Sequence, residues 1–212
     1  MYSLSLKNIF QSRDKLKVTI IDSGLGGKVF AKNLNDEIKD LDIVLNIDVE
    51  GFPYGQKDLI WLKERLELLV SQAKTNVVVI ACNTLSSLIY YYDLKFKKVV
   101  VDVITPTIYF LRMKKYQKIC ILGTKNTIKI DVYRKLLSSN IIYIDTTDLI
   151  NDLENNRDYT ISLFEIIDKI EDDCDLVILG CTHLISIKNE FRKILKKDIL
   201  SQDEVFVELL KM

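Results

Sequence analysis

Two short segments of this chain repeat one pattern, and the repeat constrains the fold more than any other feature. Residues 77–84 read VVVIACNT, and residues 176–183 read LVILGCTH. Each is an apolar run of the kind found in buried strands, and each ends on a cysteine followed by a small hydroxyl or amide residue. The segments VTIIDSG at 18–24 and KICILGT at 118–124 also match and lie about 100 residues apart. The sequence therefore predicts a duplicated α/β unit that carries paired thiols.

The spacing of apolar residues predicts strands that alternate with helices along the chain. Strands are expected at 17–21, 43–48, 77–81, 99–103, 118–122, 141–144, 176–180 and 198–200. Helices are expected at 28–40, 58–74, 83–91, 127–138, 160–171, 187–197 and 203–210. Apolar strands between helices are typical of mostly parallel sheets covered on both faces. We expect an α/β fold of two facing, pseudo-symmetric domains, the first from residues 1–101 and 203–212 and the second from residues 102–202, with a link near 102–107.

Composition excludes several classes of partner. The chain carries 30 Lys and Arg residues against 30 Asp and Glu residues, so no net charge would attract nucleic acid or anionic lipid. The longest apolar stretches are about six to eight residues, well short of the roughly 20 that span a bilayer. Residues 1–14 do not resemble a signal peptide. We therefore expect a cytoplasmic protein without a membrane segment, acting on a small neutral or zwitterionic ligand.

The four cysteines lack a CxxC pair, which fits a reducing compartment better than a disulfide framework. Cys120 and Cys174 lie in or beside strand patterns and are expected to be small core residues. Cys82 and Cys181 could also be inert core thiols, but a strand end beside a helix N-terminus favours thiolate. Zinc fits poorly, because these two cysteines and His183, the only histidine, lack the spacing of common zinc sites.

Two further segments predict contacts at the same sheet edge. Asp22-Ser23-Gly24-Leu25-Gly26-Gly27 leaves a predicted strand and opens a helix, so its amides and the helix N-terminus can hold an anion such as a carboxylate. Val29 and Asp22 stand where dinucleotide and Walker motifs need glycine. Phe52-Pro53-Tyr54-Gly55-Gln56-Lys57 places a phenol at the edge where ligands gather in open α/β sheets. The alternatives are a plain strand-to-helix turn and a plain surface turn.

Taken together, five motifs in order resemble those of glutamate racemases and span nearly the whole chain. They are Asp22 to Gly27, Pro53-Tyr54-Gly55, Ala81-Cys82-Asn83-Thr84, Gly123-Thr124 to Thr127, and Leu179-Gly180-Cys181-Thr182-His183. The resemblance implies two facing α/β domains with one cysteine from each, and a two-base mechanism without cofactor or metal. One thiolate would take the α-proton, and the other thiol would return a proton to the opposite face. By similarity, Asp22 would partner Cys82 and His183 would partner Cys181.

The resemblance also implies how the substrate is held and used. Backbone, hydroxyl and amide groups would bind its carboxylates and amino group, and they come from Ser23, Pro53, Tyr54, Gly55, Asn83, Thr84, Thr124, Thr127 and Thr182. Aspartate racemases commonly carry glutamate where His183 stands, so glutamate is the favoured substrate, and D-glutamate would supply peptidoglycan. The resemblance allows a homodimer. The alternatives are a racemase for aspartate or another substrate, and a relative that binds a small acid or a protein without turnover.

Four departures from the family pattern are visible, and the chain is shorter than typical members. Thr105 stands where many relatives carry glutamate, and Leu184-Ile185 replaces an aromatic residue and proline. The segment 145–156 lacks the usual Cys-Pro and later Glu pattern, and Ser201-Gln202 replaces an Asp-Ser pair. These differences bear on domain packing, dimer contacts and turnover more than on the identity of the two bases.

Overall fold

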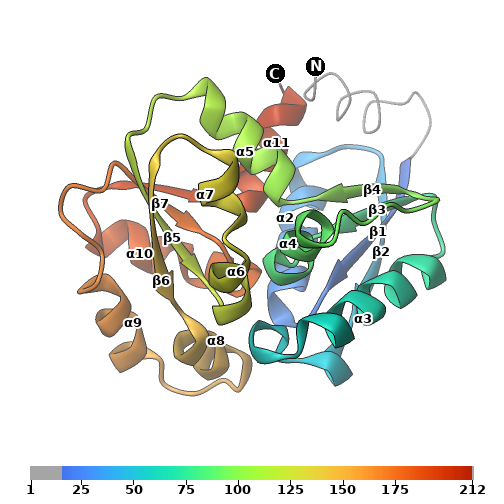
Figure 1. Ribbon diagram of the computed structural model, residues 1–212, viewed down its shortest axis with the longest axis horizontal. Coiled ribbons are helices and arrows are strands. Elements are labelled where there is room, and N and C mark those ends of the chain that lie inside the picture. Colours follow the sequence, from blue (N-terminus) through green and yellow to red (C-terminus); the bar gives the residue numbers. More distant parts are fainter. Residues whose placement is uncertain (1–15, 212) are drawn as a thin grey trace.

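The computed structural model describes residues 16–211 and contains two four-stranded parallel sheets, one in each half of the molecule (Figure 1). The first sheet has the order β2-β1-β3-β4 and the second the order β6-β5-β7-β8. The strands of the first sheet are β1 (Leu16–Asp22), β2 (Leu41–Ile47), β3 (Val77–Ile80) and β4 (Val99–Asp102). Those of the second are β5 (Lys118–Gly123), β6 (Asn140–Asp145), β7 (Leu176–Leu179) and β8 (Asp198–Ser201). All eight predicted strands are present, which confirms the α/β fold.

The two sheets repeat one topology, because each places its first and third strands side by side at the centre. Ile21 of β1 pairs with Ile80 of β3, and Leu122 of β5 pairs with Leu179 of β7. Each cysteine of the repeated motif follows its central strand by two residues. The repeated sequence motifs therefore occupy equivalent positions in the two sheets.

Helices and short 3₁₀ turns connect the strands. The first half contains α2 (Leu25–Glu37), η1 (Val49–Gly51), η2 (Tyr54–Gln56), α3 (Leu59–Gln72) and α4 (Asn83–Tyr91). Next along the chain come α5 (Ile104–Met113), α6 (Lys125–Ile130), α7 (Val132–Leu136), α8 (Thr147–Glu154), α9 (Thr160–Ile167), η3 (Thr182–Ile187), α10 (Lys188–Ile194) and α11 (Gln202–Lys211). The C-terminal helix α11 packs on both α5 and α2, and so joins the two halves (Figure 1).

The structure differs from the predicted helices at two places, and it shows that the predicted link is helical. The helix expected at 127–138 is two helices, α6 and α7, divided at Asp131, whose φ of 60° is left-handed. The link expected near Pro106 is the start of α5, because proline needs no N–H partner in the first turn of a helix. The helix α8 had no predicted counterpart, and it contributes to the site described below.

The apolar core consists of two clusters of buried side chains. The larger runs from the first sheet to one face of the second and includes Val79, Ile121 and Phe206. The smaller covers the other face of the second sheet, under α8, α9 and α10, and includes Leu149 and Phe191. Because the larger cluster is continuous across both sheets, the carboxyl ends of the central strands are held opposite one another.

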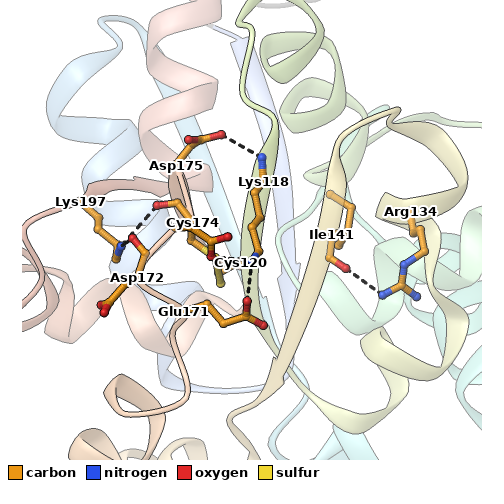
Figure 2. Close-up of a disulfide and its surroundings, with 10 residues drawn as sticks. Lys118, Cys120, Arg134, Ile141, Glu171, Asp172, Cys174, Asp175 and Lys197 are labelled. Carbon is orange, nitrogen blue, oxygen red and sulfur yellow. Dashed lines mark hydrogen bonds and ion pairs between the residues drawn. A yellow bond between two sulfur atoms is a disulfide. The ribbon is translucent and has the colours of Figure 1, made fainter.

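Cys120 and Cys174 form a disulfide, which corrects the expectation of two separate core thiols (Figure 2). Cys120 lies in β5, and Cys174 precedes β7, the strand that pairs with β5. Their Cα atoms are therefore 6.2 Å apart despite a sequence separation of 54 residues. Both side chains are buried in the second half, and Lys118 forms ion pairs with Glu171 and Asp173 at the adjoining surface.

Candidate functional site

A single cavity collects most of the residues that the sequence singles out. It is a small cavity of about 20 Å³ between the carboxyl ends of the central strands. Its lining consists of Ser23, Phe52, Pro53, Tyr54, Gly55, Gln56, Cys82, Asn83, Thr84, Thr124, Thr147, Ile150, Asn151, Gly180, Cys181, Thr182 and His183. Two predicted site residues, Asp22 and Thr127, lie behind this lining and contact it through Thr182 and through Thr84 and Thr124. Phe52, Gln56, Gly180 and the three α8 residues line the cavity without having been predicted.

Cys82 is a free, buried thiol at the start of α4. Burial raises the pKa of the Cys82 thiol, and the charge of Asp22 raises it further. The backbone N–H groups of Leu85 and Thr84 hydrogen-bond to the sulfur and act in the opposite direction. The resting state of Cys82 is therefore the thiol, which can donate a proton into the cavity.

Asp22 is fully buried at the end of β1, with its carboxylate held by groups from both halves. The Gly24 backbone N–H donates to Oδ1 at 3.1 Å, and the Thr182 hydroxyl donates to Oδ2 at 3.0 Å. Burial raises the pKa of Asp22, although the positive charge of His183 and the hydrogen bonds work to lower it. A carboxyl group with a raised pKa beside Cys82 is suited to accept and return a proton.

Cys181 has a different neighbour, the imidazole of His183. The sulfur lies 3.6 Å from His183 Nδ1, and the opposite ring nitrogen, Nε2, lies 2.6 Å from Oε2 of Glu154. Burial alone would lower the pKa of His183, but the contacts with Cys181 and Glu154 outweigh it and raise the pKa to about 10. The protonated ring can therefore donate one N–H to each neighbour.

Glu154 is a site residue that the sequence reading missed. The segment 145–156 lacks the usual glutamate pattern of the family, yet Glu154 ends α8 beside His183. Its Oε2 also accepts the backbone N–H of Leu25, at the N-terminus of α2, at 3.0 Å. The expected anion site at this helix N-terminus thus receives a carboxylate of the protein itself. The only available signal was an acidic residue at the end of a short amphipathic stretch.

The glycine-rich loop after β1 serves close packing between the halves. A Cβ at Gly26 would overlap the backbone of Thr182 and His183, and a Cβ at Gly24 would lie 2.7 Å from His183 Nε2. Glycine therefore allows α2 to approach η3 of the second half. Ser23 is the loop residue that reaches the cavity lining.

Three threonines form a hydroxyl cluster where the halves meet at the cavity. Thr84 Oγ1 lies 2.9 Å from Thr124 Oγ1 and 3.5 Å from Thr127 Oγ1, and the last two are 3.2 Å apart. Hydroxyl groups can rotate to donate or accept, so this cluster can turn its O–H groups toward a bound anion. Gly55 allows the close approach of η2, since a Cβ there would lie 2.6 Å from Thr124 Cβ.

The predicted phenol of Tyr54 is present, but its hydroxyl is bound to the protein. It donates to Asp48, whose carboxylate also accepts two hydrogen bonds from Arg65, one of them 2.7 Å from Nε. The Arg65 guanidinium lowers the pKa of Asp48. The turn 53–55 therefore offers backbone and ring surface to the cavity, with its shape fixed by the Asp48–Arg65 pair.

Among residues 16–211, no group of three or more His, Cys, Asp or Glu side chains could hold a metal ion. No helix in the described part of the chain is long and apolar enough to cross a membrane.

The chain is similar to a known protein family and to several of its members. Residues 46–210 match the family model described as Asp/Glu/Hydantoin racemase. The chain is 28% identical over 202 residues to the glutamate racemase of Aliarcobacter butzleri, covering 87% of this chain and 77% of the relative. It is 30% identical over 198 residues to the glutamate racemase of Buchnera aphidicola, covering 85% of this chain and 77% of that relative. The crystal structure of glutamate racemase from Campylobacter jejuni superimposes with a TM-score of 0.79 at 27% identity, covering 92% of this chain and 85% of that one.

Proposed function

This chain belongs to the Asp/Glu/hydantoin racemase family, and we propose that it interconverts L-glutamate and D-glutamate. The observation that carries the proposal is the pair of free cysteines, Cys82 and Cys181. They follow equivalent central strands of two similar sheets and line one cavity. The relatives named above are glutamate racemases, which favours glutamate as the substrate.

The two thiols act as the two bases. An α-hydrogen of an amino acid is a very weak acid, so base and acid must flank the carbon closely in a site that stabilises the developing charge. With L-glutamate, the Cys181 thiolate takes the α-proton and the C–H bond breaks. The Cys82 thiol then gives its proton to the opposite face of the carbon and becomes the thiolate. Turnover thus exchanges the protonation states of the two sulfurs, and the reverse reaction runs through the same groups.

Each sulfur has its own group for moving protons. Asp22 exchanges or orients the proton of Cys82, and His183 does the same for Cys181. His183 suits this role because its ring nitrogens contact Cys181 on one side and Glu154 on the other. Asp22 suits it because its carboxyl group is buried with a raised pKa.

The substrate carboxylates are bound by neutral donors. None of the described residues that line the cavity is Lys or Arg, and both ring nitrogens of His183 contact Cys181 and Glu154, so O–H and N–H groups must take the negative charge. The donors come from Ser23, Asn83, Thr84, Thr124, Thr127 and Thr182 and from the turn formed by Pro53, Tyr54 and Gly55.

We also propose a biological role for the enzyme. D-glutamate made by this enzyme would supply peptidoglycan synthesis in the cytoplasm, and the reaction would require no metal or organic cofactor. A homodimer remains a prediction, which light scattering of the purified protein tests.

Purified protein incubated with L-glutamate tests the function directly, with D-glutamate measured by chiral chromatography. We expect an equal mixture of enantiomers at equilibrium, and the same rate after dialysis against EDTA. L-aspartate serves as the comparison substrate and should react much more slowly. Preference for aspartate, or glutamate binding without turnover, would overturn the assignment.

A further inference from the structure

Asn83, which lines the cavity next to Cys82, is held by two buried side chains from the other half of the molecule. Gln202 begins α11 and is 1% exposed, and Tyr133 lies in α7 and is fully buried. The Asn83 amide nitrogen donates to Gln202 Oε1, and Gln202 Nε2 donates back to Asn83 Oδ1. The Tyr133 hydroxyl also donates to Asn83 Oδ1 at 3.0 Å and accepts from Gln202 Nε2 at 2.9 Å. The three side chains form a closed ring of hydrogen bonds.

The hydrogen bonds of this ring determine which donor and acceptor groups of Asn83 remain for a ligand. A carboxamide oxygen has two lone pairs, and both of those on Asn83 are used, by Gln202 and by Tyr133. The amide nitrogen has two hydrogens, of which Gln202 uses one. Asn83 therefore retains one N–H donor and no free acceptor. A donor of this kind suits a carboxylate rather than an ammonium group.

The ring of hydrogen bonds holds the Asn83 side chain at one place in the cavity wall. A substrate carboxylate can reach the remaining N–H of Asn83 only while the side chain stays at this place. The ring is fully shielded from solvent, because Asn83, Gln202 and Tyr133 are each at most 3% exposed. Buried hydrogen bonds of this kind fix a side-chain orientation because leaving a partner unpaired is costly.

We propose that Gln202, together with Tyr133, is a positioning residue that holds the Asn83 side chain at the cavity wall, where its remaining N–H donates to a substrate carboxylate. The inference rests on the proposed racemase function and goes beyond it by giving a role to the Ser201-Gln202 pair, a departure from the family pattern. It also makes the junction between β8 and α11 part of substrate recognition.

Steady-state kinetics of Gln202→Leu and Tyr133→Phe test this role. Gln202→Leu removes the reciprocal amide pair, and we expect KM for glutamate to rise about tenfold while kcat changes much less. Tyr133→Phe removes only a hydroxyl and is expected to raise KM about threefold, so it remains informative if Gln202→Leu folds poorly. The matched control is Tyr143→Phe, because Tyr143 lies outside both the hydrogen-bonded ring and the cavity lining, and its substitution should leave KM unchanged.

A double-mutant cycle separates positioning from a general structural effect. In an Asn83→Ala background, Gln202→Leu should raise KM by less than about twofold, because the side chain that it positions is gone. An equal rise in both backgrounds, or an unchanged KM in both single variants of an active wild-type enzyme, would overturn the positioning role alone. A wild-type enzyme that does not racemise glutamate would instead overturn the proposed function on which this inference rests.

Discussion

The surroundings of Cys82 and of Cys181 differ more than the strands that carry them. Both cysteines follow the third strand of a four-stranded parallel sheet, and both are buried at one cavity. Cys82 lies beside the carboxyl group of Asp22 and the N-terminus of α4. Cys181 lies beside the imidazole of His183, which is paired with Glu154. A duplicated scaffold thus supplies matched positions, while unmatched neighbours give each sulfur its own proton chemistry.

The two surroundings are also connected across the halves. Thr182, which follows Cys181, donates a hydrogen bond to Asp22, the neighbour of Cys82. Glu154, from the second half, accepts the N–H of Leu25 in the first half. Neither thiol site is complete in one half alone. This arrangement predicts that closure of the two halves and assembly of the acid–base groups occur together.

Replacing either thiol should have the largest effect on turnover, because both faces of the carbon need a sulfur. Serine is a far weaker base than a thiolate, so Cys82→Ser and Cys181→Ser should each lower kcat by about 1,000-fold or more. Chiral chromatography of the glutamate enantiomers measures the loss. Cys120→Ser is the matched control, because that cysteine lies outside the cavity, and it should keep the wild-type kcat. Near-native turnover in either serine variant would remove that cysteine from the mechanism.

Replacing the neighbours of the two thiols should affect the two directions of the reaction differently. We expect Asp22→Asn and His183→Asn each to lower kcat by about 10- to 100-fold. His183→Asn should act mainly on the conversion of L-glutamate, where Cys181 is the base, and Asp22→Asn on the conversion of D-glutamate. The ratio of forward to reverse kcat/KM is fixed by the equilibrium between enantiomers. The asymmetry must therefore show in kcat and in primary isotope effects with 2-deuterated substrates. Identical changes in both directions would reject one helper for each thiol.

The titration of His183 tests the Cys181 side alone, because the chain contains one histidine. Its ring resonances in the NMR spectrum should titrate near pH 10 in the wild type and at lower pH in Glu154→Gln. The raised pKa contributes stability that is fully present below the ordinary pKa of 6.5 and is lost as the pH rises through about 10. The difference in stability between wild type and His183→Asn should shrink over that window. Titration of the wild-type ring near pH 6.5 would contradict the assigned contacts.

The disulfide should have the smallest effect on catalysis, because it lies in the core of the second half and outside the cavity. Reduction, or the Cys120→Ser substitution, should lower the free energy of unfolding by about 2 to 4 kcal/mol and leave kcat unchanged at room temperature. Urea denaturation with and without dithiothreitol measures the change. Equal stability of the oxidised and reduced proteins would show that the bond contributes nothing to the fold.

The sequence predicts the sheets well because the strand signal is local and is repeated. Eight apolar runs of the right length identify eight strands, and the repeat relates their order in the two halves. The sequence predicts the helices α5 and α8 poorly. A proline in the first turn of a helix is easily taken for a break, and an eight-residue helix gives too short a window for periodicity.

Contacts made by packing were the features that the sequence could not supply. Glu154 reaches His183 only because α8 packs on η3, and Cys120 meets Cys174 only because β5 pairs with β7. Gln202 contacts Asn83 across 119 residues of sequence. By contrast, the lining residues next to Cys82 and Cys181 follow directly from their place after a strand.

In the proposed mechanism, two different thiols serve opposite faces of one carbon. Racemisation of L-glutamate in deuterium oxide, stopped at early times, tests it most directly by mass spectrometry of the separated enantiomers. We expect D-glutamate to carry deuterium at the α-carbon, because the Cys82 proton exchanges with solvent before it is delivered. The remaining L-glutamate should keep its original hydrogen. Deuterium entering both enantiomers at equal rates, or D-glutamate that retains the original hydrogen, would contradict the two-thiol mechanism.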